Sequence, residues 1–340
     1  MRQDLEPAAG LPVLPPSYEE PLEIHQRYVD GEVVGVIELD SVGSSANRLE
    51  EVLVALHRAG EYPLPVASTT VAPGDGSTPI TITTLEMPHR VFDAWLRLSD
   101  GDANGTPFER TSLGEELALA HPRALDPLLE TSAHDLVLGA WDSHRKGPAG
   151  QLRIARSFTS TLIGLNPVVL RQVAARRDPL NIGDASDAPK GARKLSEEGL
   201  SSIPPQRTRL GVSIQSARYQ GFLSFAGLRR LGFERYDAVE ARVMLAALCL
   251  YALTLRDAMG WSLRAQCELI PLSDLQFGLA RRSSSHAEPF ALGVDDAKRL
   301  FLEAVARVGI EDRNVRLEAG TRLNDLVGKA ITASKADGSR

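Results

Sequence analysis

The chain has 340 residues, of which 43 % are hydrophobic and 24 % are charged, and these proportions exclude a wholly disordered protein. No run of about 18 apolar residues occurs, and the first residues lack the apolar segment of a signal peptide, so we expect a cytoplasmic protein that crosses no membrane. Two cysteines are too few for a disulfide framework or a thiolate zinc site. The net charge of −6 argues against a nucleic-acid partner.

The net charge hides an uneven distribution along the chain. Residues 139–235 carry 16 Lys and Arg against 7 Asp and Glu, a net charge of +9, so the rest of the chain carries −15. Arg outnumbers Lys by 32 to 6, and Arg pairs bidentately with phosphate and stacks on bases. A GC-rich genome explains this ratio equally well, but it does not explain the clustering. The basic span therefore removes the objection to a nucleic-acid partner.

Periodicity predicts the first elements of the chain. Residues 1–22 are rich in Pro and Glu and indicate a loose arm. The apolar run at residues 33–39 predicts a buried strand. Ser44 or Ser45 is placed to cap the helix that follows, whose leucines and valines share one face. Residues 60–132 are mixed and indicate an insertion.

The second half of the chain predicts further strands and two helices. Core strands are expected within residues 134–141 and 153–165, strand-like composition returns at 212–225, and a final strand is expected at 263–272. Residues 236–259 predict a long buried helix, and residues 294–308 predict an amphipathic helix. Residues 171–209 show little periodicity and predict a functional or disordered loop, and the tail after residue 333 is expected to be disordered.

Without the insertions, the order of elements approaches β-α-β-β-α-β. We therefore expect an α+β protein with an RRM-like (ferredoxin-like) core, a fold whose sheet leaves one face open to bind RNA. The predicted organisation is a loose N-terminal arm (1–22), the first strand and helix of the core (23–59), an insertion (60–132), core strands (133–170), a basic insertion (171–210), completion of the core with the long helix (211–310), and a C-terminal extension and tail (311–340).

Sequence motifs of common enzyme classes are missing. The chain has no phosphate loop, dinucleotide fingerprint, His-Glu-x-x-His, paired Cys-x-x-Cys or Gly-x-Ser-x-Gly, and its seven histidines are scattered. We therefore expect no cofactor and no metal. Asp40, at the end of the first predicted strand, could hold a metal or position a water for phosphodiester cleavage. The preferred interpretation is that Asp40 caps the turn through backbone amides.

Residues suited to a sugar-phosphate backbone gather in the turn after the first predicted strand and in the basic span. Hydroxyls, amides and Arg hold phosphate and ribose without reading sequence. The candidate RNA-binding residues are Ser41, Ser44, Ser45, Asn47, Arg48, Arg156, Ser157, Thr159, Arg176, Arg177, Arg193, Lys194, Arg207, Arg209, Arg218, Arg229 and Arg230. Helix capping, an edge strand or a solvated loop explains each group equally well when it is taken alone. Tyr219, Phe222 and Phe225, interleaved with arginines, suit base stacking, although the two phenylalanines suit a core equally well.

One segment resembles a known family. Residues 36–50, Val-Ile-Glu-Leu-Asp-Ser-Val-Gly-Ser-Ser-Ala-Asn-Arg-Leu-Glu, are similar to the N-terminal signature of the backbone subunit of type I-G (formerly I-U) CRISPR effector complexes, within the RAMP superfamily. Two weaker stretches follow in the family's order. They are Leu-Gly-Ala-Trp-Asp-Ser at 138–143 with Arg-Ser-Phe-Thr-Ser at 156–160, and Leu-Ser-Phe-Ala-Gly-Leu-Arg-Arg-Leu-Gly-Phe at 223–233. The resemblance covers roughly residues 30–270.

The resemblance implies an RRM-like core with a finger-like insertion at 60–132 and a thumb-like insertion at 171–210. It implies a subunit of a Cascade ribonucleoprotein in antiviral defence, with copies bound head to tail along the guide RNA (crRNA) beside other Cascade subunits. The target DNA strand would pair with the guide, and this subunit would not be an enzyme. In related type III complexes an aspartate near the first helix cuts RNA, so a metal-dependent RNA-cleaving subunit using Asp40 is one alternative. A protein-only scaffold is the other.

Overall fold

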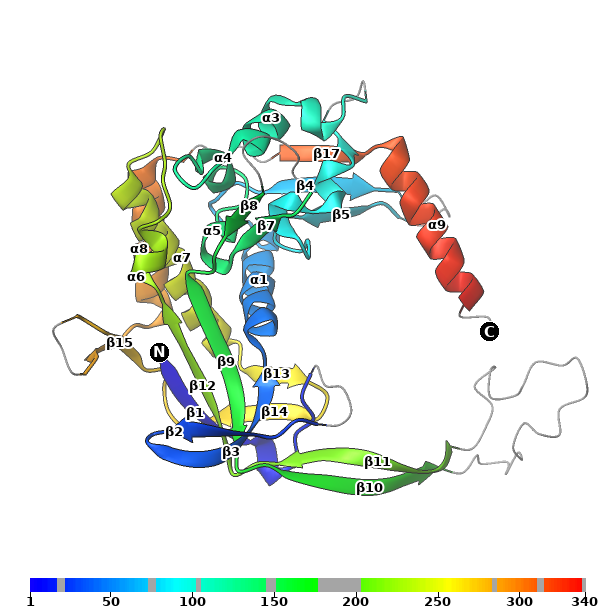
Figure 1. Cartoon of the computed structure of the whole chain (residues 1–340), viewed down its shortest axis with the longest axis vertical. Coiled ribbons are helices and arrows are strands. Elements are labelled where there is room, and N and C mark those ends of the chain that lie inside the picture. The colour runs from blue at the N-terminus through cyan, green and yellow to red at the C-terminus, as the bar shows by residue number, and fades with distance from the viewer. Residues whose placement is uncertain are drawn as a thin grey trace, which may run out of the picture.

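A computed structural model describes residues 1–16, 22–72, 78–101, 105–144, 151–176, 203–282, 286–310 and 315–337, with the backbone alone for 171–176, 203–210 and 331–337. The fold is a mixed α and β structure around a seven-stranded sheet of order β13-β14-β1-β12-β9-β3-β2 (Figure 1). Its strands are β1 (Arg2–Pro7), β2 (His25–Val29), β3 (Glu32–Asp40), β9 (Phe158–Leu165), β12 (Ser216–Leu223), β13 (Trp261–Arg264) and β14 (Cys267–Pro271).

Two long helices connect strands of this sheet along the chain. Strand β1 is antiparallel to both β12 and β14, and β12 is antiparallel to β9. Strands β1 and β9 therefore run parallel with β12 between them, and β12 and β14 run parallel with β1 between them. Helix α1 (Val42–Arg58) lies between β3 and β9 in the chain, and α7 (Ala238–Ala258) lies between β12 and β13. The two helices pack on each other, and α1 packs on β9.

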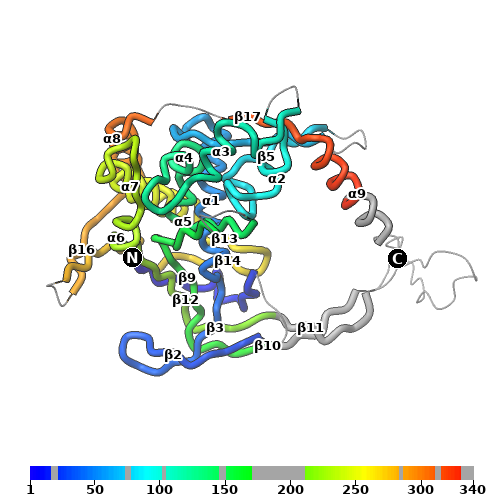
Figure 2. Tube along the Cα trace, turned by 45° about the horizontal axis from the view of Figure 1, so that its top comes forward, coloured from blue at the N-terminus to red at the C-terminus, as the bar shows by residue number. Residues whose placement is uncertain are grey.

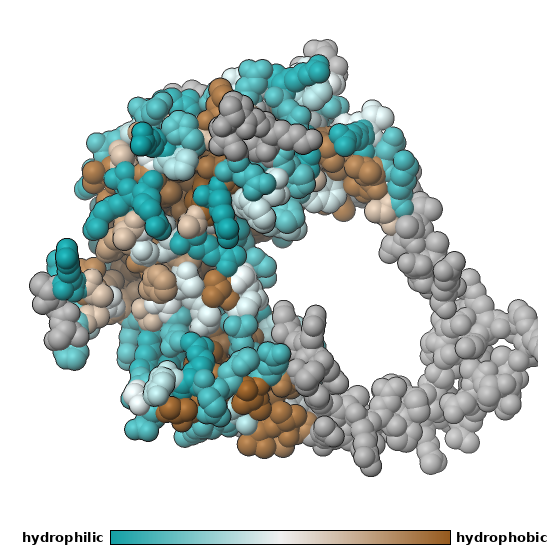
Figure 3. Space-filling model, viewed as in Figure 1, coloured by the Kyte–Doolittle hydropathy of each residue, from teal (hydrophilic) through white to brown (hydrophobic). Residues whose placement is uncertain are grey.

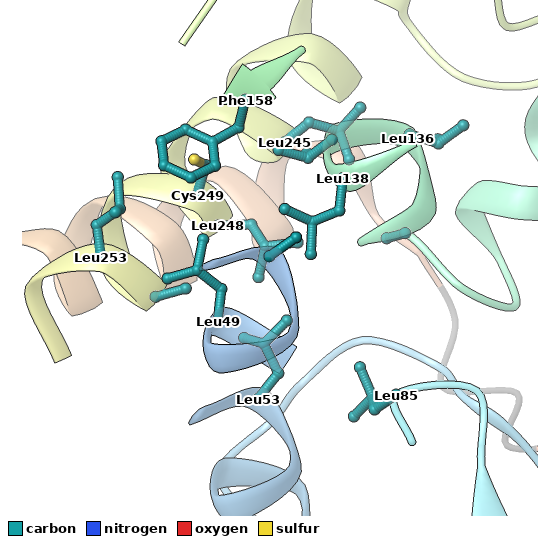
Figure 4. Close-up of a cluster of buried hydrophobic side chains, with 14 of the residues drawn as sticks. Leu49, Leu53, Leu85, Leu136, Leu138, Phe158, Leu245, Leu248, Cys249 and Leu253 are labelled. Atoms are coloured by element: carbon teal, nitrogen blue, oxygen red, sulfur yellow. The ribbon is translucent and has the colours of Figure 1, made fainter. Parts of the chain in front are cut away.

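The main core lies between the sheet and these helices. Phe158 of β9 contributes to a cluster with Leu49 of α1 and with Leu245, Leu248 and Cys249 of α7 (Figure 4). Each of these side chains is nearly inaccessible to solvent. Burial of a large apolar side chain, such as Phe158 or Leu245, contributes about 1.5–3 kcal/mol to stability. Helix α8 (Val294–Val308) packs along α7 from the other side.

Helix α7 is the one helix in the described ranges that is long and apolar enough to cross a membrane. More than half of its most apolar window is buried within the protein, and Met244 and Leu245 are fully covered. This burial is typical of the core helix of a globular domain. Both predicted long helices are confirmed, since the expected ranges were 236–259 and 294–308.

The prediction of a loose arm at the N-terminus is wrong for residues 2–7. These residues form β1, which lies near the middle of the sheet between β12 and β14. Gln3, Leu5 and Pro7 are buried, whereas the alternate residues are more exposed. This alternation was not recognised in the sequence, because charged residues are not expected in a central strand. In the structure, Asp4 is paired with Arg218 of the neighbouring strand. Strand β3, which was the expected first core strand, is instead next to the edge of the sheet and forms a hairpin with β2.

The strand predicted at residues 134–141 is also wrong. Residues 135–138 form a helical turn, α5 (Asp135–Leu138), and a short strand, β7 (Ala140–Asp142), follows and pairs with β8 (Leu152–Ile154). Gly139, with φ of 88°, separates the two elements. An apolar run of this length fits a buried helical turn as well as a strand.

A second lobe lies at the far end of α1 from the seven-stranded sheet (Figures 1 and 2). We call it the upper lobe; it consists of a four-stranded sheet of order β5-β4-β17-β6 with short helices around it. Its elements are β4 (Ala67–Val71), β5 (Ile80–Thr83), η2 (Arg90–Phe92), α2 (Ala94–Arg97), β6 (Ser99–Asp100), η3 (Phe108–Arg110), α3 (Ser112–Leu119), α4 (Asp126–Leu129) and β17 (Val315–Ala319). The insertion at 60–132 thus receives a strand from the C-terminal region, which pairs in parallel with β4.

Three further elements project from the body. Strands β10 (Val168–Arg176) and β11 (Ile203–Ser213) form an antiparallel two-stranded ribbon that leaves the large sheet (Figure 1). The expectation of irregular structure is therefore wrong at both ends of the segment 171–209, and residues 177–202 lie outside the described ranges. Helix α9 (Thr321–Asp337) continues past residue 333, where a disordered tail was expected. Strands β15 (Phe277–Leu279) and β16 (Glu288–Phe290) form a small hairpin.

Candidate nucleic-acid interface

The large sheet has one face covered by helices and one open face. Side chains alternate along β9 and β12, so that Phe158, Ser160, Leu162 and Tyr219 are buried on the helix side. Their neighbours point to the other side. We call the surface formed by Thr159, Thr161, Gln220 and Phe222 the open face, and these residues line a shallow hollow of about 290 Å³ together with Met1, Ser160 and Gly221.

The strand register places these four side chains in a compact group. Phe222 lies opposite Thr159, and Gln220 lies opposite Thr161. Strands β9 and β12 pass in front of α7 in Figure 1, and the same side of the molecule in Figure 3 combines hydrophilic residues with isolated apolar ones. The open face thus presents hydroxyl and amide groups beside one aromatic ring.

Three aromatic side chains are exposed at the end of β12 and the neighbouring hairpin. Phe222 is 59 % exposed, Phe225 at the start of α6 (Phe225–Leu228) is 46 % exposed, and Trp141 of β7 is 54 % exposed. Phe222 and Phe225 therefore do not belong to the core. Tyr219, the third aromatic candidate, is buried and packs edge-on against Trp261 at 4.9 Å between ring centroids.

Trp141 and Arg153 were not predicted as interface residues. They face each other across the β7–β8 hairpin, and the Arg153 guanidinium lies 5.7 Å from the centroid of the Trp141 ring. This distance allows a cation–π interaction. Trp141 lies within the stretch of family resemblance at residues 138–143, and Arg153 lies just before the part at residues 156–160. The hairpin that joins the two residues could not be deduced from their spacing in the sequence.

Hydrogen bonds join α5, which directly precedes the β7–β8 hairpin, to the residues before β9, and join these residues to the start of α6. The amide of Ser157 donates to the carbonyl of Val137 at 2.9 Å, and the amide of Ser224 donates to the carbonyl of Ser157 at 2.7 Å. Arg156 is exposed, and its Nε donates to the carbonyl of Leu138 at 3.0 Å. Arg229 and Arg230, which follow α6, are also exposed. Arg156 therefore lies between the β7–β8 hairpin and β9 in the chain, and Arg229 and Arg230 directly follow the helix that carries Phe225.

The side chains of Ser41 and Ser45 serve the fold, whereas Ser44 lies in the first turn of α1 and contributes its backbone amide. The N-cap of α1 is Ser41 and not the predicted Ser44 or Ser45, because the Ser41 Oγ accepts a hydrogen bond from the Ser44 amide at 3.2 Å. Ser45 is buried, and its hydroxyl lies 2.6 Å from that of Ser160. Burial raises the pKa of the adjacent Tyr219 to about 12, against the smaller opposing effect of the hydrogen bonds from Ser160 and Ser45. Asn47, by contrast, is exposed on α1.

Asp40 and Arg48 form a buried ion pair. Arg48 Nε lies 3.2 Å from Asp40 Oδ2, and the side chains are only 14 % and 3 % exposed. A terminal nitrogen of Arg48 also donates to the carbonyl of Leu263 at 3.3 Å. Within the described ranges, Asp40 is not grouped with other acidic, His or Cys side chains that could hold a metal ion. Asp40 therefore pairs with Arg48, whereas Asp40 Oδ1 has no hydrogen-bond partner among the described residues, so the predicted capping of the turn through backbone amides is not observed.

Arg218 is also neutralised within the protein. It lies on β12, and its guanidinium contacts Asp4 and Asp30 at 2.7 Å each. Hydrogen bonds from Arg218 and then Arg2 hold the pKa of Asp30 below its usual range. Arg218 thus joins β12, β1 and the turn of the β2–β3 hairpin.

The other predicted residues are placed as follows. Ser157 is buried, and its Oγ has no hydrogen-bond partner in the described part of the chain. Arg176, Arg207 and Arg209 lie on the two strands of the β10–β11 ribbon. Arg177, Arg193 and Lys194 lie outside the described residues.

A buried charged cluster joins the upper lobe to α1. Arg90 Nε donates to Glu50 Oε1 at 2.6 Å, and an Arg90 terminal nitrogen donates to the carbonyl of Gly139 at 2.9 Å. Asp135 lies 4.0 Å from Arg90 and 3.2 Å from the ring of His134. Burial lowers the pKa of His134 to about 3 and raises that of Asp135 to about 8. Sequence reasoning missed this cluster, because its members are far apart along the chain.

The fold and this surface define a mixed α and β protein whose main sheet has an exposed aromatic and basic edge. Residues 1–168 match a family described as CRISPR-associated protein GSU0053 (Cas_GSU0053). This match confirms the resemblance found in the sequence at the level of a CRISPR-associated family. The matched span runs from β1 to the beginning of β10 and includes the turn signature at residues 36–50. No curated protein matches the chain.

Proposed function

We propose that the chain is the non-catalytic guide-RNA-binding backbone subunit of a CRISPR complex that targets DNA. The observation that carries this proposal is the open face of β9 and β12, on which Phe222 is exposed, together with exposed Phe225, Trp141 and arginines on the following helix and the preceding hairpin. Single-stranded nucleic acid is commonly held by exposed aromatic rings that stack on bases and by cations that follow the backbone. The match of residues 1–168 to a CRISPR-associated family supports an RNA partner.

The connectivity supports an RRM-like core. If β1, β9, β12 and β14 are its four strands and α1 and α7 its two helices, the chain follows β-α-β-β-α-β with each parallel pair split by one antiparallel strand. RRM sheets stack two or three bases on aromatic residues of their open face. The upper lobe would then be the finger-like insertion, and the β10–β11 ribbon the base of the thumb-like insertion.

The proposed mechanism leaves the base edges of the guide free. Stacking on Phe222, Phe225 or Trp141 tolerates any base, because every base has a π face. Arg156, Arg229 and Arg230 would contact phosphates, which positions the RNA without reading its sequence. The guide can then select the target DNA strand through base pairing.

The geometry at Asp40 supports the non-catalytic form of this proposal over the RNA-cleaving alternative. A catalytic carboxylate must reach a metal ion or the attacking water beside the scissile phosphate. The Asp40 side chain is 3 % exposed and bound to Arg48. Its pairing with Arg48 is an alternative reason for its place in the signature.

Head-to-tail copies along one RNA and contacts with other Cascade subunits complete the proposal. The net charge of −15 outside residues 139–235 gives the protein acidic surface that can meet the basic span of a neighbouring copy.

Fluorescence anisotropy of a labelled single-stranded RNA with the full chain tests the proposal. Phe222→Ala removes one stacking ring, and loss of one stacked base costs about 1–3 kcal/mol, which weakens binding about 5- to 150-fold. Tyr28→Ala is the matched control, because Tyr28 is an exposed ring on β2 at the edge of the same sheet. Equal affinities of Phe222→Ala and wild type would contradict the proposal. Absence of RNA binding by wild type would favour a protein scaffold.

A further inference from the structure

Two arginines of the large sheet share a pair of carboxylates. Arg2 of β1 and Arg218 of β12 each contact Asp4 and Asp30, at distances of 2.7 to 3.2 Å between nitrogen and oxygen. Arg2 holds Asp30 as a fork, with one terminal nitrogen 2.9 Å from Oδ1 and the other 3.2 Å from Oδ2. Arg218 Nη1 donates to the same Oδ2 at 2.7 Å. The Asp30 carboxylate therefore accepts three hydrogen bonds from two guanidinium groups.

This group of charges lies on the same side of the sheet as the open face. Arg218 and Gln220 are two residues apart on β12, so their side chains leave the strand on the same side. Arg2 lies opposite Gln220 in the β1–β12 register, and Asp4 lies opposite Arg218. Phe222 is four residues from Arg218, which is roughly 13 Å along the strand. The two arginines therefore extend the open face along β12.

The two carboxylates are attached to the protein in different ways. Asp4 is a residue of β1, which is paired on both sides within the sheet. Asp30 lies in the turn of the β2–β3 hairpin, which curves across the lower end of the large sheet in Figure 1. Asp30 and Gly31 have φ of 51° and 90°, as the two central residues of a tight hairpin turn do. Tyr28 and Val33, on either side of this turn, are exposed, so the hairpin tip presents Asp30 from a solvated segment.

The contact of Asp30 with the arginines is suited to exchange. The Asp30 side chain is 57 % exposed, and ion pairs that are this exposed shift an equilibrium by about fivefold at most. A phosphodiester carries the same single negative charge and has two oxygens free to accept from the Arg2 fork and from Arg218. Asp4 continues to hold both guanidinium groups when Asp30 leaves, because it accepts from Arg218 Nε at 2.7 Å and from Arg2 at 3.2 Å.

We propose that Arg2 and Arg218 form a phosphate site for single-stranded RNA and that Asp30 occupies this site in the free protein. A phosphodiester of RNA bound on the open face displaces the Asp30 carboxylate, and the tip of the β2–β3 hairpin then leaves the sheet. The exchange conserves charge, because one anion replaces another between the same two cations. This inference rests on the proposed function, since the RNA is the one held by the open face. The hairpin is thus a competitor that lowers the RNA affinity of the wild type.

Removal of the competing carboxylate tests this exchange by fluorescence anisotropy of a labelled single-stranded RNA at about 0.15 M salt. Asp30→Asn keeps the turn, because Asn tolerates positive φ, and it should bind RNA about two- to fivefold more tightly than wild type. Glu32→Gln is the matched control, since it removes the same charge from an exposed position of the same hairpin and leaves Asp30 in place. Its affinity should equal that of wild type.

The outcomes separate this inference from the proposed function. Equal affinities of Asp30→Asn and Glu32→Gln would overturn the exchange, although a weakened Phe222→Ala variant would still place RNA on the open face. Absence of RNA binding by wild type would overturn the exchange and the proposed function together.

A spin label on the hairpin tip measures the movement itself. The two native cysteines are buried, so Val33→Cys provides one accessible thiol for a nitroxide. In the electron paramagnetic resonance spectrum of the free protein, the label should be less mobile than in the same protein with Asp30→Asn. Bound RNA should raise its mobility to the level of that second variant. A spectrum that is unchanged or more immobilised when RNA binds would overturn the release of the hairpin.

Discussion

At the scale of single residues, the pairing of Asp40 with Arg48 changes the meaning of the most specific sequence motif. The sequence identified the turn and its residue types correctly, but it could not show which groups face solvent. The side chains of Asp40, Ser45 and Arg48 point into the protein, where they bond to Ser160, to Leu263 and to one another. The residues that remain free for a ligand, such as Phe222, were those with the most ambiguous sequence pattern.

This pairing predicts a cost in stability. Asp40→Asn leaves the Arg48 guanidinium largely buried without its anion, and breaking such a pair from one side costs about 3 kcal/mol. Asp30→Asn is the matched control, since the Asp30 side chain is more than half exposed and its loss should cost less than about 1 kcal/mol. Urea unfolding of the three proteins measures both values. An Asp40→Asn protein that keeps full stability and loses an RNA-cleaving activity of the wild type would instead identify a catalytic aspartate.

The buried His134 predicts a dependence of stability on pH. Its folded pKa of about 3 lies below its ordinary value of 6.5, so between these values the unfolded chain holds a proton that the folded chain lacks. The contribution of His134 is therefore fully present above pH 6.5 and is lost as pH falls toward 3.

A variant isolates this contribution from those of Glu50, Arg90 and Asp135, which surround the ring. The free energy of unfolding of wild type relative to His134→Gln should decrease as the pH is lowered from 7 to 4.5. Urea unfolding at several pH values measures this difference. A difference that is constant over this range would show that His134 keeps its ordinary pKa in the folded state.

At the scale of elements, the sequence predicted the long helices well and the sheet incompletely. Helix α8 has the predicted bounds, because its apolar stripe and polar face repeat over four turns. Strand β1 was missed because Asp4 and Glu6 interrupt a six-residue segment, and Asp4 finds its partner Arg218 more than 200 residues later. Residues 135–138 were predicted as part of a strand and form a helical turn, because a short apolar run without periodicity fits either structure.

The central position of β1 predicts a strong effect of a small deletion. Leu5 is fully buried between the sheet and its helices, so Leu5→Ala should cost about 2–5 kcal/mol. Leu11→Ala, which changes an exposed leucine of the same N-terminal segment, should cost less than about 0.5 kcal/mol. Chemical denaturation measures both. Equal stabilities of the two variants would show that residues 2–7 do not belong to the sheet.

At the scale of the whole molecule, the division of charge separates a basic span from an acidic remainder. Part of the basic span is neutralised inside the protein, as Arg218 shows. Arg229 and Arg230 are exposed next to Phe225 and carry the proposal that the interface contacts phosphates. Composition alone could locate the basic span, but only the tertiary structure separates these arginines from the paired ones.

These arginines predict a change in salt dependence. Each lost phosphate contact reduces the slope of log affinity against log salt by about 0.7 for a single strand, so Arg229→Gln with Arg230→Gln should reduce it by about 1.4. The double variant Arg316→Gln with Arg322→Gln removes the same charge from exposed positions of the upper lobe and α9, and its slope should equal that of wild type. Anisotropy titrations at several salt concentrations measure the slopes. Equal reductions in both double variants would indicate a nonspecific effect of net charge.

The most direct test of the central claim is ultraviolet crosslinking of a 4-thiouridine-substituted guide RNA to the full chain, with the linked residues identified by mass spectrometry. If the open face and its aromatic edge hold the guide, the crosslinks will fall on Phe222, Phe225 and Trp141 or on their immediate neighbours in β9, β12 and the β7–β8 hairpin. Crosslinks confined to the upper lobe, around Phe92 and Phe108, or to α8 on the helix-covered side, would contradict the account.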